Sequence, residues 1–184
     1  MTMSNSHIYA VLQTPNAAVH VFGDDGRFPN NEKLPLVVYQ NAVKLPQQDP
    51  AATFEQIFHA NEWGSCWRNG IYPYHHYHST AHEVLGISRG EAAVRLGGDD
   101  RGQTFEVRSG DVIIIPAGVA HKNLGSSWDF QVVGAYPLGQ KWDMNYGKSG
   151  ERPQALRNIA RVPLPKTDPV YGREGQLAKY WDLL

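Results

Sequence analysis

The sequence predicts a single all-β domain, built as a sandwich or barrel of short strands. Between residues 72 and 136, seven apolar segments follow one another about eight to ten residues apart, with glycine-containing turns between them. The chain contains 18 Gly and 12 Pro, whereas only 19% of its residues are charged, a composition typical of turn-rich folds. A length of 184 residues suits one domain with one sizeable core.

The chain divides into an N-terminal extension (residues 1–69), a core (residues 70–137) and a tail (residues 138–184). We expect the tail to wrap the domain as an extended segment with one helical turn at Ala155–Ala160. Apolar runs bounded by turn residues predict strands at His20–Phe22, Leu36–Tyr39, Tyr72–His78, Glu83–Ser88, Glu91–Leu96, Thr104–Val107, Val112–Ile115, His121–Leu124 and Phe130–Tyr136. Alternation along the core strands places these side chains on the inner faces: Leu85, Ile87, Val94, Leu96, Phe105 and Val107.

One helix is expected in the extension. Asp49-Pro50 predicts its start, because Asp caps free backbone N–H groups and Pro suits the first helical position. Phe54, Ile57 and Phe58 then share one helical face. We expect this face to pack on the domain and the helix to end near Gly64.

Charge and hydropathy exclude several classes of function. Seventeen basic and 18 acidic residues leave a net charge of −1 with no basic patch, so nucleic acid is not an expected partner. No apolar run approaches the ~20 residues of a membrane-spanning helix, and the first residues resemble no secretory signal. Cys66 is the single cysteine and forms no internal disulfide. We therefore expect a cytoplasmic protein.

The histidines between residues 75 and 121 form the chemical signal. On a strand, Tyr72, Tyr74, His76 and His78 share one face, and two imidazoles two residues apart are well placed to bind one metal ion. His75 is expected to face outward. The two tyrosines either line a pocket beside the metal or merely cap the barrel.

Two further residues complete a candidate ligand set. Glu83 opens the next strand and is able to turn back onto the same ion, and His121 follows the turn at Pro116–Gly118. Three neutral nitrogens and one carboxylate oxygen suit Fe, Mn, Ni, Zn or Cu, and the sequence does not choose among them. Such a site leaves positions open for water or substrate, as catalytic metal sites require.

The spacing of these residues resembles the cupin family. Gly70-x5-His76-x-His78-x4-Glu83-x6-Gly90 fits the first cupin motif, and Gly110-x5-Pro116-x-Gly118-x2-His121 fits the second except at its end. The resemblance covers residues 70 to about 136 and implies a double-stranded β-helix, or jelly-roll barrel, with the metal at one end. Three further segments are similar to the uncharacterised bacterial YjlB-type cupins: Pro29–Asn31, Gly134–Pro137 and Asp168–Gly172. Cupins often pair through edge strands, so the resemblance implies a homodimer.

The chain departs from the second motif at one position. The family pattern has Asn four residues after the last histidine, where this chain has Gly125. Asn123 lies two residues after His121 instead, and in a regular strand it would face inward as a supporting or substrate-facing amide. His82 should point away from the metal, with either a hydrogen-bonding role at the strand end or a place behind the ligands.

Two classes of function remain open. The first is a metalloenzyme acting on a small oxygenated metabolite as a dioxygenase, isomerase or decarboxylase, with Glu83 as ligand or base. The second is a sensor or storage protein that binds a small molecule or metal without turnover. Two narrower readings have less support: Glu83 argues against a thiol dioxygenase that uses Cys66, and a sugar-nucleotide epimerase needs a basic pocket, whereas Arg95 and Arg108 are expected to face outward.

Overall fold

The computed structural model describes residues 10–183, so residues 1–9 of the predicted N-terminal extension and Leu184 lie outside it. Its strands are β1 Asn16–Phe22, β2 Asn31–Gln40, β3 Trp63–Asn69, β4 Glu83–Arg89, β5 Glu91–Leu96, β6 Gln103–Arg108, β7 Val112–Ile115, β8 His121–Ser126 and β9 Gln131–Pro137. Its helices are α2 Pro50–Ala60, α3 Arg152–Ile159 and α4 Gln176–Tyr180.

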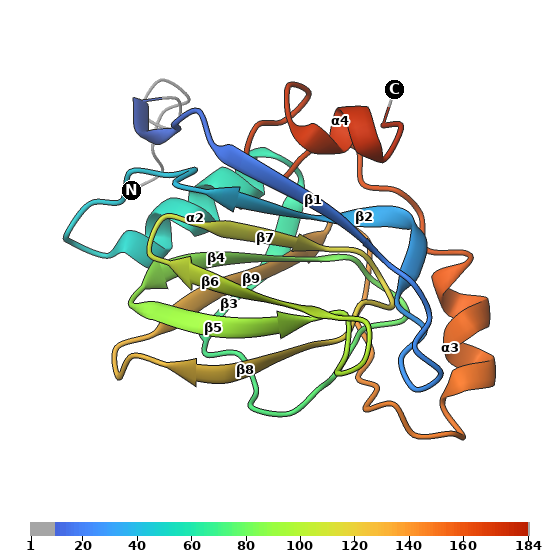
Figure 1. Ribbon diagram of the computed structural model, residues 1–184. Helices are drawn as coiled ribbons and strands as arrows, with labels where there is room; N and C mark the ends of the chain where they lie inside the picture. Colours follow the sequence, from blue (N-terminus) through green and yellow to red (C-terminus); the bar gives the residue numbers. More distant parts are fainter. Residues whose placement is uncertain (1–9, 184) are drawn as a thin grey trace.

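The strands form two antiparallel sheets that face each other (Figure 1). The larger sheet has the order β1-β2-β7-β4-β9-β3, and the smaller has the order β6-β5-β8. An all-β fold was predicted from the strand pattern and is confirmed. The closed barrel implied by the resemblance is not observed, because the strand pairing leaves the two sheets separate.

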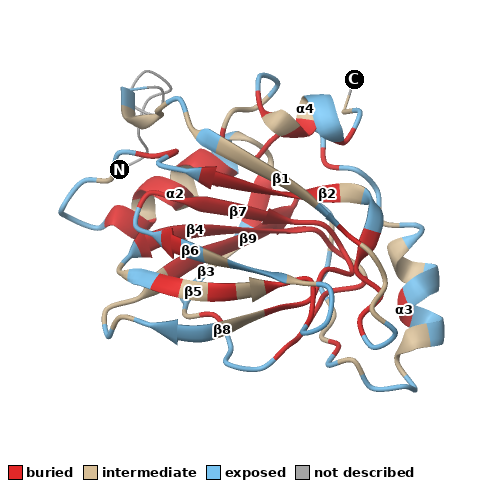
Figure 2. Ribbon diagram, in the orientation of Figure 1, coloured by how far each residue is buried: buried red, intermediate tan, exposed pale blue. Residues whose placement is uncertain are grey.

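The central strands β4, β7 and β9 of the larger sheet are buried on both faces, which explains why they are apolar along nearly their whole length (Figure 2). Its inner face packs on the smaller sheet, and its outer face packs on α2 and α4. The inner-face prediction is confirmed for five residues, which are buried in this core: Leu85, Ile87, Val94, Leu96 and Val107. The sixth, Phe105, is partly buried and packs against them.

Helix α2 covers the outer face through Phe54, Ile57 and Phe58, which are fully buried. It starts after Asp49 but ends at Ala60, because Gly64 is already part of β3 and pairs with Tyr136. Asp49 does not cap the helix with its side chain; its carboxylate accepts a hydrogen bond from Arg68 instead.

The segment from Tyr72 to His78 is not the strand we predicted. It is irregular, and its backbone makes two isolated bridges, His76 with His121 and Tyr77 with Asn145. Pro73 lacks an N–H group, which disfavours a regular ladder here. His75 was expected to face outward, but it is buried against Phe28 and lies 3.0 Å from an Asp99 carboxylate oxygen.

The last part of the tail, which includes α4, packs on the outer face of the larger sheet (Figure 1). Trp181 is 1% exposed, and its indole N–H donates to the Pro35 carbonyl. Asp168 is fully buried and accepts a hydrogen bond from the Tyr39 hydroxyl at 2.5 Å. The helical turn expected at Ala155–Ala160 corresponds to α3, which begins three residues earlier.

Replacing Tyr39 with Phe should lower the free energy of unfolding by about 1–3 kcal/mol, because Asp168 would stay buried and lose its hydroxyl donor. Urea denaturation of the two proteins measures the difference. An unchanged midpoint at equal slope would show that this hydrogen bond does not help to hold the tail.

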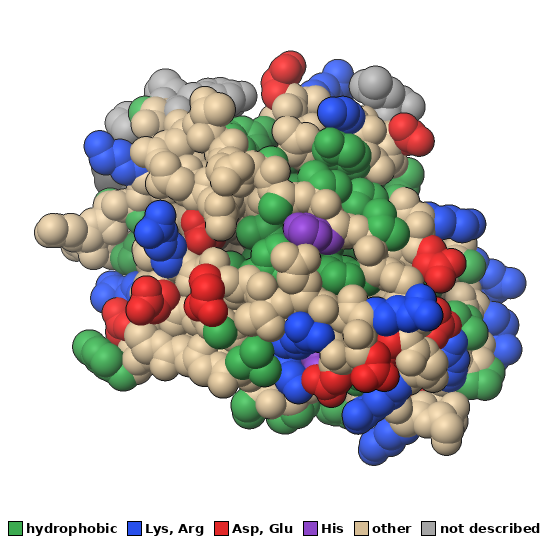
Figure 3. Space-filling model, viewed as in Figure 1, with side chains coloured by type: hydrophobic (Ala, Val, Ile, Leu, Met, Phe, Trp, Pro, Cys, Tyr) green, Lys and Arg blue, Asp and Glu red, His purple; other side chains and the backbone are tan. Residues whose placement is uncertain are grey.

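Two surface properties bear on partners. Basic and acidic side chains lie next to one another on the face shown in Figure 3. None of the helices within residues 10–183 combines the length and apolar character needed to cross a membrane.

Candidate metal centre

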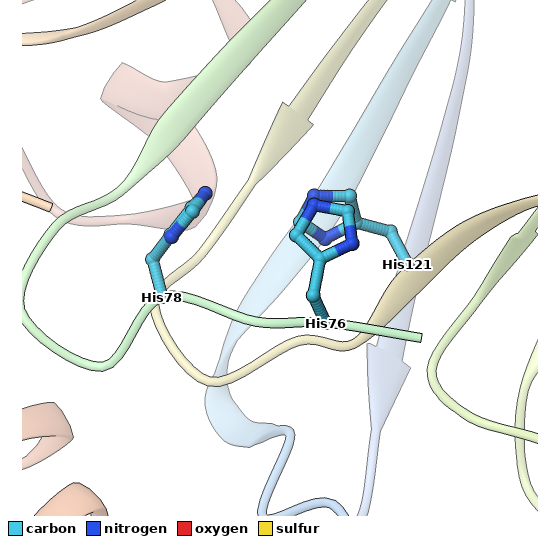
Figure 4. A group of neighbouring side chains, drawn as sticks. All are labelled: His76, His78 and His121. Carbon is cyan, nitrogen blue, oxygen red and sulfur yellow. The ribbon is translucent and has the colours of Figure 1, made fainter. Parts of the chain in front are cut away.

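Three histidines converge between the sheets. His76 and His78 come from the irregular loop before β4, and His121 is the first residue of β8. The His76 and His121 backbones bond to each other in both directions, which brings their ring centroids within 4.0 Å. One nitrogen from each ring lies within 4.8 Å of the others, and Figure 4 shows the rings directed toward one another.

Backbone carbonyls fix the orientation of each ring. Nδ1 of His76 lies 3.2 Å from the Tyr74 oxygen, Nδ1 of His121 lies 3.2 Å from the Val119 oxygen, and Nδ1 of His78 bonds to the Asp143 oxygen. A carbonyl only accepts, so each Nδ1 donates a proton, and in the neutral ring Nε2 is the nitrogen that keeps a lone pair. Metal-ligating histidines are oriented in this way.

Glu83 adds a carboxylate to the three nitrogens. Its Oε2 lies 3.4 Å from His78 Nε2 and 3.3 Å from His121 Nε2. This oxygen is buried and has no hydrogen-bond donor among the described residues. Its Oε1 accepts a hydrogen bond from the Tyr136 hydroxyl at 3.0 Å. The site therefore presents one bound and one free carboxylate oxygen.

The electrostatics favour a cation at this point. Burial, together with the neighbouring His121, lowers the pKa of His76 to about 3, so this ring is neutral at neutral pH. Burial alone would raise the pKa of Glu83, but His78 and His121 hold it below its usual range. Burial alone would lower the pKa of His78, but the Glu83 charge raises it. An ionised carboxylate among imidazole lone pairs is the donor set of a divalent transition metal.

The tail holds the ligand loop in place. The Asp143 carboxylate accepts from the Ser79 and Thr80 backbone N–H groups and from the Ser79 hydroxyl. Its backbone carbonyl accepts from His78, and the Asn145 backbone pairs with Tyr77. This link between the tail and a ligand was not anticipated from the sequence. It joins residues more than 60 apart, so local spacing gives no signal for it.

A cavity of about 360 Å³ opens onto the histidines. Of the two roles left open for the tyrosines, Tyr72 has the first, because it lines the cavity. Tyr74 is not among the lining residues and stacks on Tyr72, with 5.0 Å between the ring centroids. The Trp142 ring packs against both His78 and Tyr136. Sequence reasoning did not single out several of the lining residues as site residues, among them Trp67, Arg68 and Tyr136.

Two expected supporting residues lie elsewhere. The Asn123 amide bonds to the Ser126 hydroxyl and to the Gly125 backbone N–H, so it closes a turn at the end of β8 and does not bond to the ligands. His82 accepts a hydrogen bond from the Ala117 backbone N–H and packs on Trp181. Of the two roles left open for His82, the structure therefore favours hydrogen bonding at the strand end.

Comparison with known proteins finds similarity both in the motif region and along most of the chain. The cupin family model matches residues 66–135. The uncharacterized protein YjlB of Bacillus subtilis (strain 168) is 45% identical over 162 residues, which cover 88% of this chain and 94% of YjlB. The chain is a YjlB-type cupin.

Solved structures similar to this cupin are more distant. Procruciferin, the 11S globulin of Brassica napus, is 16% identical with a TM-score of 0.38, and the match covers 71% of this cupin and only 28% of the globulin chain. Acireductone dioxygenase of Bacillus anthracis, solved with a cadmium ion in its active centre, is 17% identical with a TM-score of 0.38, covering 52% of this cupin and 64% of the dioxygenase.

Cys66 of this cupin lies outside the cavity lining and packs against the outer core. Burial and the nearby Glu55 charge raise the pKa of its thiol, which disfavours the reactive thiolate. We expect Cys66→Ser to retain full metal content, as measured by elemental analysis, and any activity. Strong loss of activity at full metal content would restore the thiol dioxygenase interpretation.

Proposed function

We propose that this cupin is a metal-dependent enzyme that acts on a small oxygenated metabolite. His76, His78, His121 and Glu83 would hold one divalent ion of Fe, Mn, Ni or Zn. The observation that carries the proposal is the free Oε2 of buried Glu83, which faces imidazoles anchored through Nδ1. A metal in such a site supplies a Lewis acid or, as iron, activates O2.

The cavity supports a ligand with an apolar body and few charges. Aromatic and aliphatic side chains form much of its wall, including Tyr72, Trp142 and Leu85. Among the described residues that line the cavity, Arg68 is the one Lys or Arg, and its guanidinium is bound by both Asp49 and Glu55. Because neither Arg95 nor Arg108 lines the cavity, a sugar nucleotide diphosphate would find no free cation there.

Within this proposal Glu83 serves primarily as a ligand. Its Oε1 is held by Tyr136, and its Oε2 is enclosed with the histidines, so acting as a base would require it to leave this position. The residues around it would exclude water and orient the substrate. Dioxygenase, isomerase and decarboxylase reactions all remain compatible with this arrangement.

Turnover assays separate the enzyme from a non-catalytic binding protein. Protein loaded in turn with Fe²⁺, Mn²⁺, Ni²⁺ and Zn²⁺ is incubated with small 2-hydroxy acids, 2-oxo acids and diols, while O2 uptake and products are followed. We expect one metal to support turnover that Glu83→Gln abolishes. Ligand binding without turnover for every loaded form would favour the sensor or storage role.

We also propose that the cupin acts in the cytoplasm as a homodimer. Strands β1, β3, β6 and β8 end the two sheets, and such edges favour pairing with a second chain. Trp128, which follows β8, is 97% exposed and would find cover in such an interface. Light scattering tests the homodimer, for which we expect a particle of twice the chain mass of 20.5 kDa.

A further inference from the structure

The segment Gly134–Pro137 of β9 carries no proposed ligand, although it lies beside the candidate metal centre. We propose that Tyr136, itself oriented by Trp67, is a positioning residue that fixes the Glu83 carboxylate so that Oε2 faces the three histidines. This inference rests on the proposed metal site and adds to it the two residues that set the direction of its one charged ligand.

The three side chains lie on adjacent strands and on the same face of the larger sheet. Trp67 is on β3, Tyr136 on β9 and Glu83 on β4, in the order in which these strands pair. The Trp67 indole N–H lies 3.0 Å from the Tyr136 hydroxyl, which lies 3.0 Å from Glu83 Oε1. Tyr136 is 4% exposed and Glu83 is 2% exposed, so water does not replace these bonds at low cost.

The direction of the hydrogen bonds follows from the chemistry of the indole. An indole nitrogen only donates, so the Tyr136 oxygen accepts from Trp67 and its own proton is directed to Glu83. The Glu83 carboxylate is therefore held by one oxygen, and within residues 10–183 the other has no donor and lies 3.3 Å from His121 Nε2. The chain of bonds selects which oxygen is available to a metal.

Gly134 gives Trp67 its position. Trp67 and Gly134 are direct cross-strand partners, and a Cβ added at Gly134 would lie 2.1 Å from two carbons of the Trp67 ring. The indole therefore lies across the glycine, and its N–H reaches the hydroxyl two residues further along β9. The position of the Trp67 ring therefore explains both the glycine at position 134 and the tyrosine at position 136 of β9.

Tyr136→Phe tests the inference, with metal affinity as the readout. The dissociation constant for Zn²⁺ is measured by competition with a chromogenic chelator, and the visible spectrum of the Co²⁺ form reports the ligand geometry. We expect about 10–100-fold weaker Zn²⁺ binding and an altered Co²⁺ spectrum. Trp67→Phe, which removes the donor to Tyr136 together with part of the ring over Gly134, should change both in the same direction by less.

Tyr171→Phe is the matched control, because its hydroxyl bonds to the Gln13 and Ala42 carbonyls in the outer part of the fold. It should leave both readouts at their wild-type values. Unchanged affinity and spectrum in Tyr136→Phe would overturn this inference and leave the proposed metal site standing. The same would follow if Tyr171→Phe weakened Zn²⁺ binding as much as Tyr136→Phe does. If Tyr136→Phe does not fold, unchanged readouts in Trp67→Phe would overturn it. Wild-type protein that binds Zn²⁺ no better than His76→Ala would overturn the proposed site and this inference together.

Discussion

His121→Ala is expected to weaken divalent-metal binding by at least about 100-fold, because it removes one of four proposed donors from a site that no other described histidine can complete. The fold should survive, since residue 121 keeps both backbone hydrogen bonds to His76. Removing a metal ligand weakens metal binding more than removing a residue that only supports a ligand. The measurement is the Zn²⁺ dissociation constant, determined alongside the melting temperature.

His59→Ala is the control for this variant. His59 is exposed on α2 and is not one of the residues that line the cavity, so its loss should leave the dissociation constant unchanged. Comparable weakening in both variants would indicate non-specific histidine binding. Wild-type affinity in His121→Ala would remove His121 from the ligand set.

Truncation after Pro137 is expected to produce an insoluble or unfolded chain. It would remove Trp181 and Leu177, which are at most 1% exposed and cover the outer face of the larger sheet. Burial of such a pair stabilises a fold by on the order of 5 kcal/mol, a large part of the stability of a typical domain. The soluble yield and the melting temperature measure the effect.

The same truncation also removes Asp143, which holds the ligand loop through Ser79 and Thr80. Asp143→Ala separates this second role from the packing role. It should weaken metal binding while the rest of the tail keeps the protein soluble. A truncated chain that melts at the wild-type temperature would contradict the packing role, and wild-type Zn²⁺ affinity in Asp143→Ala would contradict the role in holding the loop.

The sequence predicted the parts of this protein that depend on local spacing. The strands of the core and the facing of Leu85 and Ile87 follow from alternation, and the convergence of His76, His78 and His121 follows from motif spacing. His76 and His78 lie close together with His121 although their segment is not a regular strand, and the backbone bridge between His76 and His121 brings these two residues together.

The parts that sequence reasoning missed depend on contacts between distant residues. The support that Tyr136 and Trp67 give to Glu83 needs the order of three strands, which no local pattern encodes. The burial of His75 depends on Phe28 and Asp99, which come from two other parts of the chain. Asn123 pairs with Val94 on the face of β8 that carries His121, as expected, but its amide bonds to Ser126 and Gly125 and not to the ligands.

Elemental analysis of the protein purified without a metal-binding tag tests the central claim most directly, with His76→Ala prepared in parallel. The four-donor site predicts about one equivalent of a single divalent transition metal per chain in the wild type and its loss in the variant. Equal metal content in the two proteins, or no metal in the wild type even after reconstitution, would contradict the claim that these residues form a metal centre.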